Sequence, residues 1–175
     1  HEDNLPEGTV AIDGKLVVKW HNEIHDICRI DEMKIKGSHN VENALAAASA
    51  AFLAGVSAEQ IADVLKTFPG IEHRIEPVKM INDVVYYNDS KATNTDAAIK
   101  ALETFPGDIV LIAGGHDKKT DLTDFMKLAS QRVNKLILLG DASARFKEAA
   151  INNGIPSDSI FEVGYSMEKA VKLAH

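Results

Sequence analysis

A polar segment from Asn88 to Asn94 is the first place in this 175-residue chain where side chains could do chemistry. It follows the apolar run VVYY and precedes a helix-like stretch. The Asp89 carboxylate could accept a ribose hydroxyl or hold a hydrated Mg²⁺, and the Lys91 ammonium could neutralise a phosphate or a developing negative charge. Thr93 or Asn94 could cap the helix and leave backbone N–H groups available to an anion. An ordinary polar loop with a helix cap explains the same spacing, so both interpretations stay open.

Two further loops combine glycine with charged residues. Gly114-Gly115 follows the apolar run IVLIA, and Lys118 lies three residues beyond the pair. Glycine lets a ligand approach the backbone closely, and the lysine could then reach an anion; a flexible, solvated loop is the alternative. Gly140-Asp141-Ala142 follows a second apolar run. Neither the phosphate-loop pattern G-x-x-x-x-G-K-[ST] nor the dinucleotide pattern G-x-G-x-x-G occurs, so neither classical nucleotide motif is predicted.

Four polar residues earlier in the chain are weaker candidates. Asn40 and Asn43 are three residues apart at the start of an alanine-rich helical pattern, so they share a helix face. Helix capping explains them equally well. His73-Arg74 offers a planar guanidinium that suits phosphate and an imidazole that can stack on a base, although such a pair is more often a surface or hinge feature.

The elements that must position these loops follow from hydrophobic patterning. The continuous apolar run 109–113 is typical of a strand buried on both faces, residues 135–140 predict a second buried strand, and residues 160–163 predict another strand. Helical patterns alternate with them at 95–104, 121–132, 142–153 and 166–174. This alternation predicts an α/β fold with a mostly parallel sheet and helices on both faces. In such sheets, ligands bind at the carboxyl ends of the strands, where the three loops are expected.

The first 70 residues have a different pattern. Residues 9–12 and 15–20 flank Asp13-Gly14 and predict a β-hairpin, with 28–30 and 33–35 as further strand pieces. Two helices are expected next, over 41–54 and from the capping residue Ser57 onward. Phe68-Pro69-Gly70 ends the second helix, so a domain boundary is predicted near Gly70. Beyond it, residues 75–81 and 84–88 predict two strands joined by a turn.

Composition narrows the classes of partner. Hydrophobic residues make up 45% of the chain and the formal net charge is −7. This charge argues against nucleic acid or an anionic membrane as a partner, and no apolar run approaches the roughly 18–20 residues of a membrane span. With Cys28 as the single cysteine, a reduced, cytoplasmic location is expected. The chain starts at His1 and stops within a helical pattern, so it is expected to be a fragment.

Four segments in this order resemble the Mur ligases of peptidoglycan synthesis: GSHNVENALAAA, EHRIE, NDSKATN and IAGGHDKKTD. The string DSKATN most resembles the branch that joins D-glutamate to UDP-N-acetylmuramoyl-L-alanine. The resemblance implies a three-domain enzyme, of which residues 1–70 would be the last part of the central ATP-binding domain. Residues 71–175 would be most of a Rossmann-like C-terminal domain that binds the amino acid. The N-terminal domain, the rest of the central domain and the magnesium ligands would lie outside this chain, leaving no metal site within it.

The resemblance also implies roles for residues of the first part and for Asp89. Asn40 and Asn43 would approach the adenine side of ATP. Arg74 would contact the phosphates, with His73 nearby, and Asp89 would contact the ribose.

The remaining implied roles concern the reacting groups. Lys91 would lie close to the transferring phosphate or the acceptor, and is taken together with Asp89 as catalytic. Thr93 and Lys118 would hold the D-glutamate side-chain carboxylate, with Ser90 as a further substrate contact. ATP and Mg²⁺ are the implied cofactors, and the chain alone is expected to be inactive. A folylpolyglutamate-type ligase, another Mur-type ligase and a non-catalytic Rossmann-like module remain alternatives.

Overall fold

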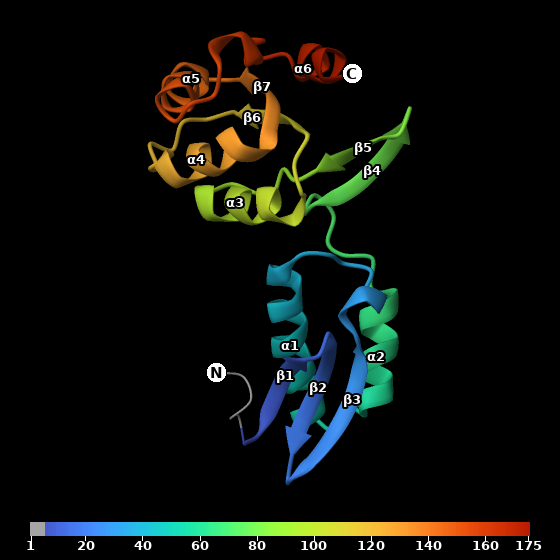
Figure 1. The fold of residues 1–175 in the computed structure, drawn as a ribbon. Coiled ribbons are helices and arrows are strands. Elements are labelled where there is room, and N and C mark those ends of the chain that lie inside the picture. The colour runs from blue at the N-terminus through green and yellow to red at the C-terminus, as the bar shows by residue number, and fades with distance from the viewer. Residues whose placement is uncertain (1–5) are drawn as a thin grey trace. The chain divides into compact units, whose positions relative to one another are not determined.

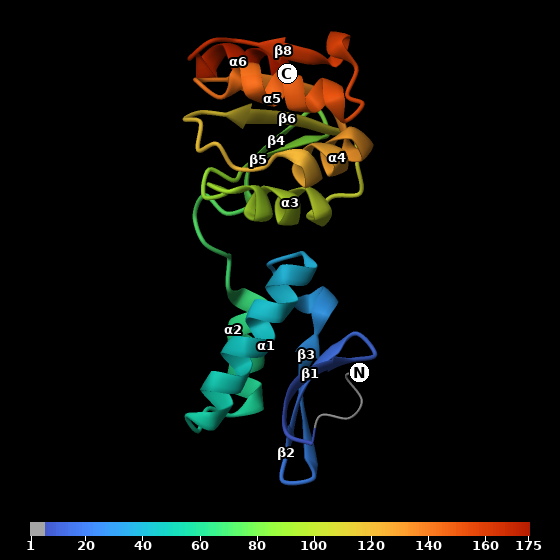
Figure 2. The same ribbon diagram turned by 90° about the vertical axis from the view of Figure 1, so that its left-hand side faces the viewer.

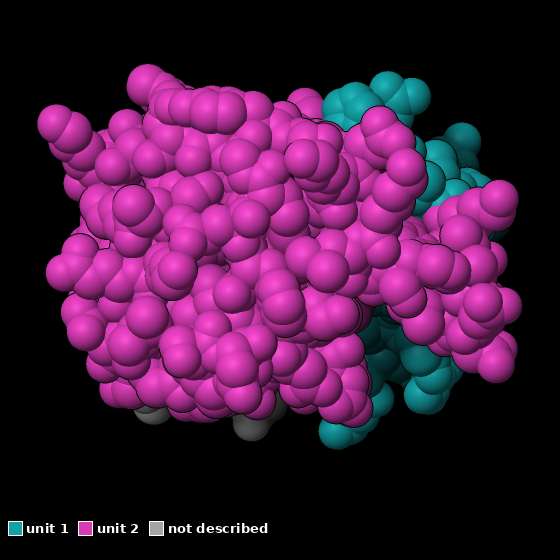
Figure 3. Space-filling view, turned by 90° about the horizontal axis from the view of Figure 1, so that it is seen from above, with its two compact units in different colours: residues 1–78 teal, residues 79–175 magenta. Residues whose placement is uncertain are grey.

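The structure is a computed structural model that describes residues 6–175. The chain divides into two compact units, residues 1–78 and 79–175 (Figure 3), and each is described by itself. The division falls within a strand, eight residues beyond the boundary predicted near Gly70. The predicted limits of the two domains, 1–70 and 71–175, stay predictions.

A three-stranded antiparallel sheet forms one layer of the first unit (Figure 1). Its strands are β1 (Gly8–Ile12), β2 (Lys15–Trp20) and β3 (Glu23–Arg29). The predicted hairpin is confirmed, because Asp13 and Gly14 both have positive φ (48° and 75°), as a tight two-residue turn requires.

The strand predicted at 33–35 is wrong. After β3 the chain forms a short 3-10 helix, η2 (Ile30–Glu32). The Glu32 carboxylate accepts a hydrogen bond from the Arg29 backbone N–H (2.9 Å), and the Lys36 ammonium donates to the carbonyls of Asp31 (2.9 Å) and Met33 (2.6 Å). These side-chain bonds curl the backbone, so it cannot extend into a strand. Met33 is fully buried and anchors this turn in the core.

Two helices cover the sheet of the first unit. They are α1 (Ser38–Leu53) and α2 (Ala58–Thr67). Ala44 and Ala48 of α1 are buried in the same core as strand residues such as Leu16, since small side chains allow close approach. The predicted cap of α2 is confirmed by reciprocal bonds between Ser57 and Gln60 (3.2 and 3.3 Å).

The second unit begins with a β-hairpin that forms a sheet of its own. Its strands, β4 (Glu76–Ile81) and β5 (Val84–Asn88), are joined by Asn82 and Asp83, which both have positive φ (48° and 64°). The two predicted strands are therefore confirmed. The loop after 84–88 is expected at the carboxyl ends of the parallel strands, but β5 pairs with β4 in a separate two-stranded sheet, because a tight turn joins these two neighbours.

The predicted parallel sheet is confirmed, with strand order β6-β7-β8. Its strands are β6 (Ile109–Gly114), β7 (Val133–Leu139) and β8 (Ile160–Glu162). The helices of this unit are α3 (Thr95–Thr104), α4 (Thr123–Arg132), α5 (Ser143–Asn152) and α6 (Met167–Ala174), with a short 3-10 helix, η3 (Ser157–Ser159). Among residues 6–175, no helix has the length and apolar character needed to cross a bilayer.

Helices cover both faces of this sheet, as the alternation of strands and helices predicted (Figure 2). The burial of 109–113 on both faces was predicted wrongly, because β6 is an edge strand: none of its residues is fully buried and Val110 is 41% exposed. Leu136 and Leu138 of β7 are fully buried in one core with residues of α3, α4 and α5. Successive side chains of a strand point to opposite faces, so Lys135 and Ile137 face the other side. There the Lys135 ammonium donates to the carbonyl of Leu173 in α6 (3.2 Å). This arrangement brings the loops that follow β6, β7 and β8 to the carboxyl edge of the parallel sheet.

Two glycines allow the loops after β6 and β7 to touch through their backbones. A Cβ on Gly114 would lie 2.1 Å from the Leu139 carbonyl oxygen, and a Cβ on Gly140 would lie 2.6 Å from the Gly115 carbonyl oxygen. Both glycines also have positive φ (123° and 79°). Hydrogen bonds from the Gly115 N–H to Leu139 (2.7 Å) and from the Ala142 N–H to Gly115 (3.0 Å) hold the two loops together.

We predict that Gly140→Ala destabilises the chain more than Gly154→Ala does. Gly154 also has positive φ (91°) but has open space around its Cβ position, so alanine there costs about 1–2 kcal/mol of backbone strain. Gly140→Ala carries that strain and also forces the Gly115 backbone away, which adds at least about 1 kcal/mol. Urea unfolding of both variants measures the difference. Equal losses would show that the loops do not depend on this close contact.

Candidate functional site

The loop between β5 and α3 is tightly turned by its own hydrogen bonds. The Asn88 side chain accepts from the Ser90 N–H (3.1 Å), and the Asp89 carbonyl accepts from the Ala92 N–H (2.9 Å). The Asn94 side chain caps α3 by accepting from the Ala97 N–H (2.8 Å). Since Asn94 supplies the cap, the Thr93 side chain is not needed for it and stays a candidate for ligand binding.

Lys118 joins the loop after β6 to this first loop. Its ammonium donates to the carbonyl oxygen of Thr93 at 3.0 Å, across 25 residues of sequence. Both residues are exposed. An ammonium has three N–H donors, so this bond leaves donors that can meet an anion beside Thr93. The structure therefore brings together Thr93 and Lys118, two of the residues predicted from sequence, and it places Ser90 and Lys91 in the same short loop as Thr93.

An arginine that the sequence analysis missed holds the loop that carries Lys118. Arg145, in α5, donates from Nε to both oxygens of Asp117 (3.0 Å each) and from Nη2 to one of them (2.7 Å). Its Nη1 donates to the Thr120 carbonyl (2.8 Å). The Arg145 guanidinium, and secondly the Lys119 backbone N–H, hold the pKa of Asp117 below its ordinary value. Nothing in the helical pattern of 142–153 distinguishes Arg145 from a solvent-facing residue, so sequence gave no signal for it.

A second polar cluster joins the loops after β6, β7 and β8. The Asp141 carboxylate lies 3.6 Å from His116 Nδ1 and accepts a hydrogen bond from the Tyr165 hydroxyl. This hydrogen bond to an anion raises the pKa of Tyr165. All three side chains are well exposed, so the cluster lies at the solvent surface of this edge. Asp141 lies in one of the loops predicted from the sequence, whereas no sequence pattern singled out Tyr165.

The predicted residues of the first unit lie in two places. In the first turn of α1, the Asn40 side-chain amide donates to the Lys36 carbonyl (2.7 Å), and Asn43 Nδ2 lies 3.5 Å from Asn40 Oδ1. These two side chains therefore lie together, as their spacing predicted.

His73 and Arg74 lie in a turn that leads into β4. The Glu76 carboxylate accepts from the His73 backbone N–H (2.8 Å) and lies 3.4 Å from His73 Nδ1. His73 and Ile75 both have positive φ (66° and 44°), so the turn projects the exposed Arg74 side chain from a kinked backbone. Sequence analysis did not single out Glu76, although the segment EHRIE contains it.

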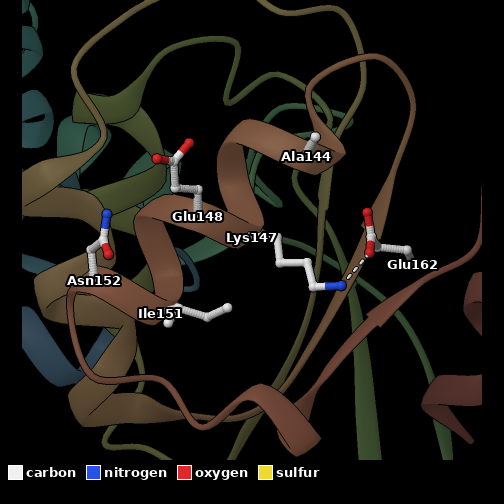
Figure 4. Close-up of a pocket in the computed structure, with 6 residues that line it drawn as sticks. All are labelled: Ala144, Lys147, Glu148, Ile151, Asn152 and Glu162. Carbon is white, nitrogen blue, oxygen red and sulfur yellow. Dashed lines mark hydrogen bonds and ion pairs between the residues drawn. The ribbon is translucent and has the colours of Figure 1, made fainter.

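A shallow hollow of about 460 Å³ lies elsewhere in the second unit (Figure 4). It is lined by α5 and the end of β8, through residues Ala144, Lys147, Glu148, Ile151, Asn152 and Glu162. Lys147 pairs with Glu162 across it at 2.6 Å. None of the predicted site residues lines it, so this hollow is not the candidate site.

The donor types fit a nucleotide better than a metal ion. The Asn40 and Asn43 amides can meet the polar edge of a base, and the exposed Arg74 guanidinium suits phosphate. Within residues 6–175, no group of three or more His, Cys, Asp or Glu side chains is arranged to hold a metal ion.

An open α/β sheet with polar loops at the carboxyl ends of its parallel strands is typical of the Rossmann-like class. A family model described as "Mur ligase, glutamate ligase domain" matches residues 73–175. The chain belongs to the Mur ligase family.

Curated relatives agree with this family. One from Thermoanaerobacter sp. (strain X514), named UDP-N-acetylmuramoylalanine–D-glutamate ligase, is 46% identical over 171 residues, which are 98% of this chain and 37% of the relative. A relative of the same name from Alkaliphilus metalliredigens is 48% identical over 150 residues, 85% of this chain and 33% of its own length. The chain thus spans about a third of the length of these relatives.

Solved structures share the fold at low sequence identity. The enzyme MurC (UDP-N-acetylmuramate-alanine ligase) of Thermotoga maritima aligns with a TM-score of 0.63 at 16% identity, over 89% of this chain and 36% of that one. A folylpolyglutamate synthase of Mycobacterium tuberculosis aligns with a TM-score of 0.65 at 15% identity, over 95% of this chain and 38% of that one. At these identities the likeness establishes the fold alone.

We predict that Asp117→Asn makes the chain slightly less stable at neutral pH, as expected for a partly exposed ion pair, and that the difference disappears in acid. A carboxyl group with a lowered pKa stabilises the fold above its ordinary pKa of about 4, and this contribution is lost as pH falls through the lowered value. The melting temperatures of both proteins between pH 7 and pH 3 measure the gap. Asp158→Asn, in the exposed η3 helix, is the control for loss of one surface charge. A gap for Asp117→Asn that persists unchanged in acid would contradict the ion pair.

Proposed function

We propose that the whole protein is an ATP-dependent, ADP-forming ligase that joins D-glutamate to UDP-N-acetylmuramoyl-L-alanine. The observation that carries the proposal is the hydrogen bond from Lys118 to the Thr93 carbonyl, which puts a cation next to the DSKATN loop. Support also comes from the name shared by the curated relatives at 46% and 48% identity. The reaction would supply a precursor of peptidoglycan, and so serve cell-wall synthesis, cell shape and division.

The reaction would have two steps, a phosphoryl transfer followed by formation of an amide bond. The γ-phosphoryl group of ATP passes to the carboxylate of UDP-N-acetylmuramoyl-L-alanine and gives an acyl phosphate and ADP. The amine of D-glutamate then attacks the acyl carbon, a tetrahedral intermediate forms, and phosphate leaves as the amide is completed. Anionic groups must approach one another in both steps, so positive charge at the site is the main requirement.

Residues of the second unit would provide that charge and orient the amino acid. Lys118 would bind the side-chain carboxylate of D-glutamate, with Thr93 and Ser90 donating hydroxyl hydrogen bonds from the neighbouring loop. Lys91, which is exposed in the same loop, would offset the charge on the transferring phosphoryl group. Asp89 would accept a hydrogen bond from the ribose.

Residues of the first unit would bind the nucleotide. Asn40 and Asn43 would meet the adenine, and Arg74, with His73 beside it, would contact the phosphates. Mg²⁺ would lower the repulsion between the phosphates and the carboxylate when bound. We place its ligands outside the part of the protein that the structure describes, and we expect this chain alone to be inactive.

The proposed partners are small molecules and the remaining domains of the same protein, with no nucleic acid and no membrane. The net charge of −7 is unfavourable for polyanionic partners. A cytoplasmic location is proposed because the substrates include ATP and the single cysteine, Cys28, is a buried thiol.

A folylpolyglutamate-type ligase is the alternative, because the fold that this chain shares with such synthases (TM-scores of 0.64 and 0.65) does not distinguish the two activities. The deciding experiment is to measure phosphate release by the whole protein with ATP and Mg²⁺, using UDP-N-acetylmuramoyl-L-alanine or a folate as the acceptor and adding D-glutamate or L-glutamate. Turnover with D-glutamate but not with L-glutamate supports the proposal. Turnover that requires a folate acceptor would overturn it, and no turnover with any acceptor would favour a non-catalytic binding module.

We predict that Lys118→Ala raises the KM for D-glutamate or lowers kcat by at least roughly tenfold. A charge-assisted hydrogen bond is worth about 1.5–3 kcal/mol, which corresponds to a loss of that size. Initial rates at limiting D-glutamate measure it in the whole enzyme. Lys119→Ala is the matched control, because the neighbouring lysine is also exposed but its contact with the loop is made by its backbone N–H. An unchanged rate for Lys118→Ala would refute this role.

A further inference from the structure

The Arg145 guanidinium spans the loop on both sides of Lys118. Three of its contacts go to the carboxylate of Asp117 (2.7–3.0 Å), and one goes to the Thr120 carbonyl (2.8 Å). Lys118 and Lys119 lie between these two anchor points. A planar, forked cation makes several bonds at once with fixed geometry, which a lysine cannot do.

The loop backbone between the anchors is strained and needs support. Lys119 has positive φ (55°), an uncommon conformation for a residue with a side chain. The Asp117 carboxylate also accepts the Lys119 backbone N–H (2.8 Å), which closes a turn around Lys118. Before this turn, the loop is fixed by the bond from the Ala142 N–H to Gly115 (3.0 Å). The Lys118 backbone is therefore held at both ends by residues that belong to β7 and α5 or follow directly from them.

Arg145 also controls the charge next to Lys118. Asp117 precedes Lys118 directly and carries a carboxylate that could otherwise attract the lysine ammonium. Arg145 occupies both oxygens of that carboxylate, while the Lys118 ammonium donates to a neutral carbonyl at Thr93. The positive charge of Lys118 thus stays available to an incoming anion.

We propose that Arg145, acting through Asp117, is a positioning residue that holds Lys118 beside Thr93 and so sets the affinity for the amino-acid substrate. This inference rests on the proposed function, because it assigns to Arg145 the orientation of the D-glutamate carboxylate site. Arg145 and Asp117 remain partly exposed, at 34% and 24% of their side-chain areas, and such pairs contribute little to global stability. The effect of losing Arg145 is therefore expected in substrate affinity far more than in folding.

The first test measures kinetics of the whole protein carrying Arg145→Gln, Arg145→Lys or the control Lys147→Gln. Lys147 also lies on α5 in an ion pair, but with Glu162 and away from the Lys118 loop. Arg145→Gln should raise the KM for D-glutamate at least about fivefold while the KM for ATP changes less than about twofold. Arg145→Lys, which keeps the charge without the fork, should fall between wild type and Arg145→Gln, and Lys147→Gln should match wild type. Equal KM values for D-glutamate in wild type and Arg145→Gln would overturn the inference.

The second test measures hydrogen exchange of the backbone amides in peptides that cover residues 114–122 of the same proteins. Faster exchange in Arg145→Gln but not in Lys147→Gln supports the positioning role, and unchanged exchange overturns it, whatever the kinetics. This measurement tests the support of the loop by Arg145 independently of the proposed function. If wild type does not ligate D-glutamate but exchange still responds to Arg145→Gln, the proposed function fails while the loop support by Arg145 stands.

Discussion

The contact between the backbones of Gly140 and Gly115 is the constraint on which the candidate site depends. There is no room for a Cβ on Gly140 or on Gly114, so the loops after β6 and β7 can lie directly on each other. This contact starts α5 at a fixed point, since the Ala142 N–H bonds back to Gly115. Arg145 follows within the first turn of α5 and therefore reaches Asp117. The close packing of these two glycines therefore determines, through Arg145 and Asp117, where Lys118 lies.

Much of the fold could be predicted because its signals are local. The apolar runs 109–113 and 135–139 form the parallel strands β6 and β7, and the helices after them begin and end within about two residues of the predicted limits. Of these two strands, only β7 has fully buried side chains, because β6 lies at the edge of the sheet, where Val110 is exposed. The Asp13-Gly14 turn needed only positive φ at two neighbouring residues. These features depend on the backbone conformations that each residue type allows and on the pattern of apolar side chains. Both can be recognised from the sequence alone.

The errors came from interactions between residues and between strands. The strand predicted at 33–35 fails because Lys36 and Glu32 bond to the backbone near η2, and no periodicity reports such bonds. The loop after β5 does not follow a strand of the parallel sheet as expected, because the tight turn before β5 pairs it with β4 in a sheet of its own. In the candidate site, the types of Thr93 and Lys118 suggested anion binding, but their meeting required the fold. Arg145 and Tyr165 lie in ordinary helical and loop patterns, and only tertiary structure brings them to Asp117 and Asp141.

The distribution of charge at the carboxyl edge of the sheet explains how an acidic chain can offer an anion site. Asp117 is bonded by Arg145, and Asp141 accepts a hydrogen bond from Tyr165 and lies near His116. Each of these carboxylates is thus engaged by a partner on another loop or helix. Lys118, by contrast, donates to a carbonyl, which orients the ammonium without neutralising it. Local pairing therefore leaves a positive centre beside the first loop although the whole chain carries a charge of −7, because screening confines electrostatic effects at the surface to about 10 Å or less.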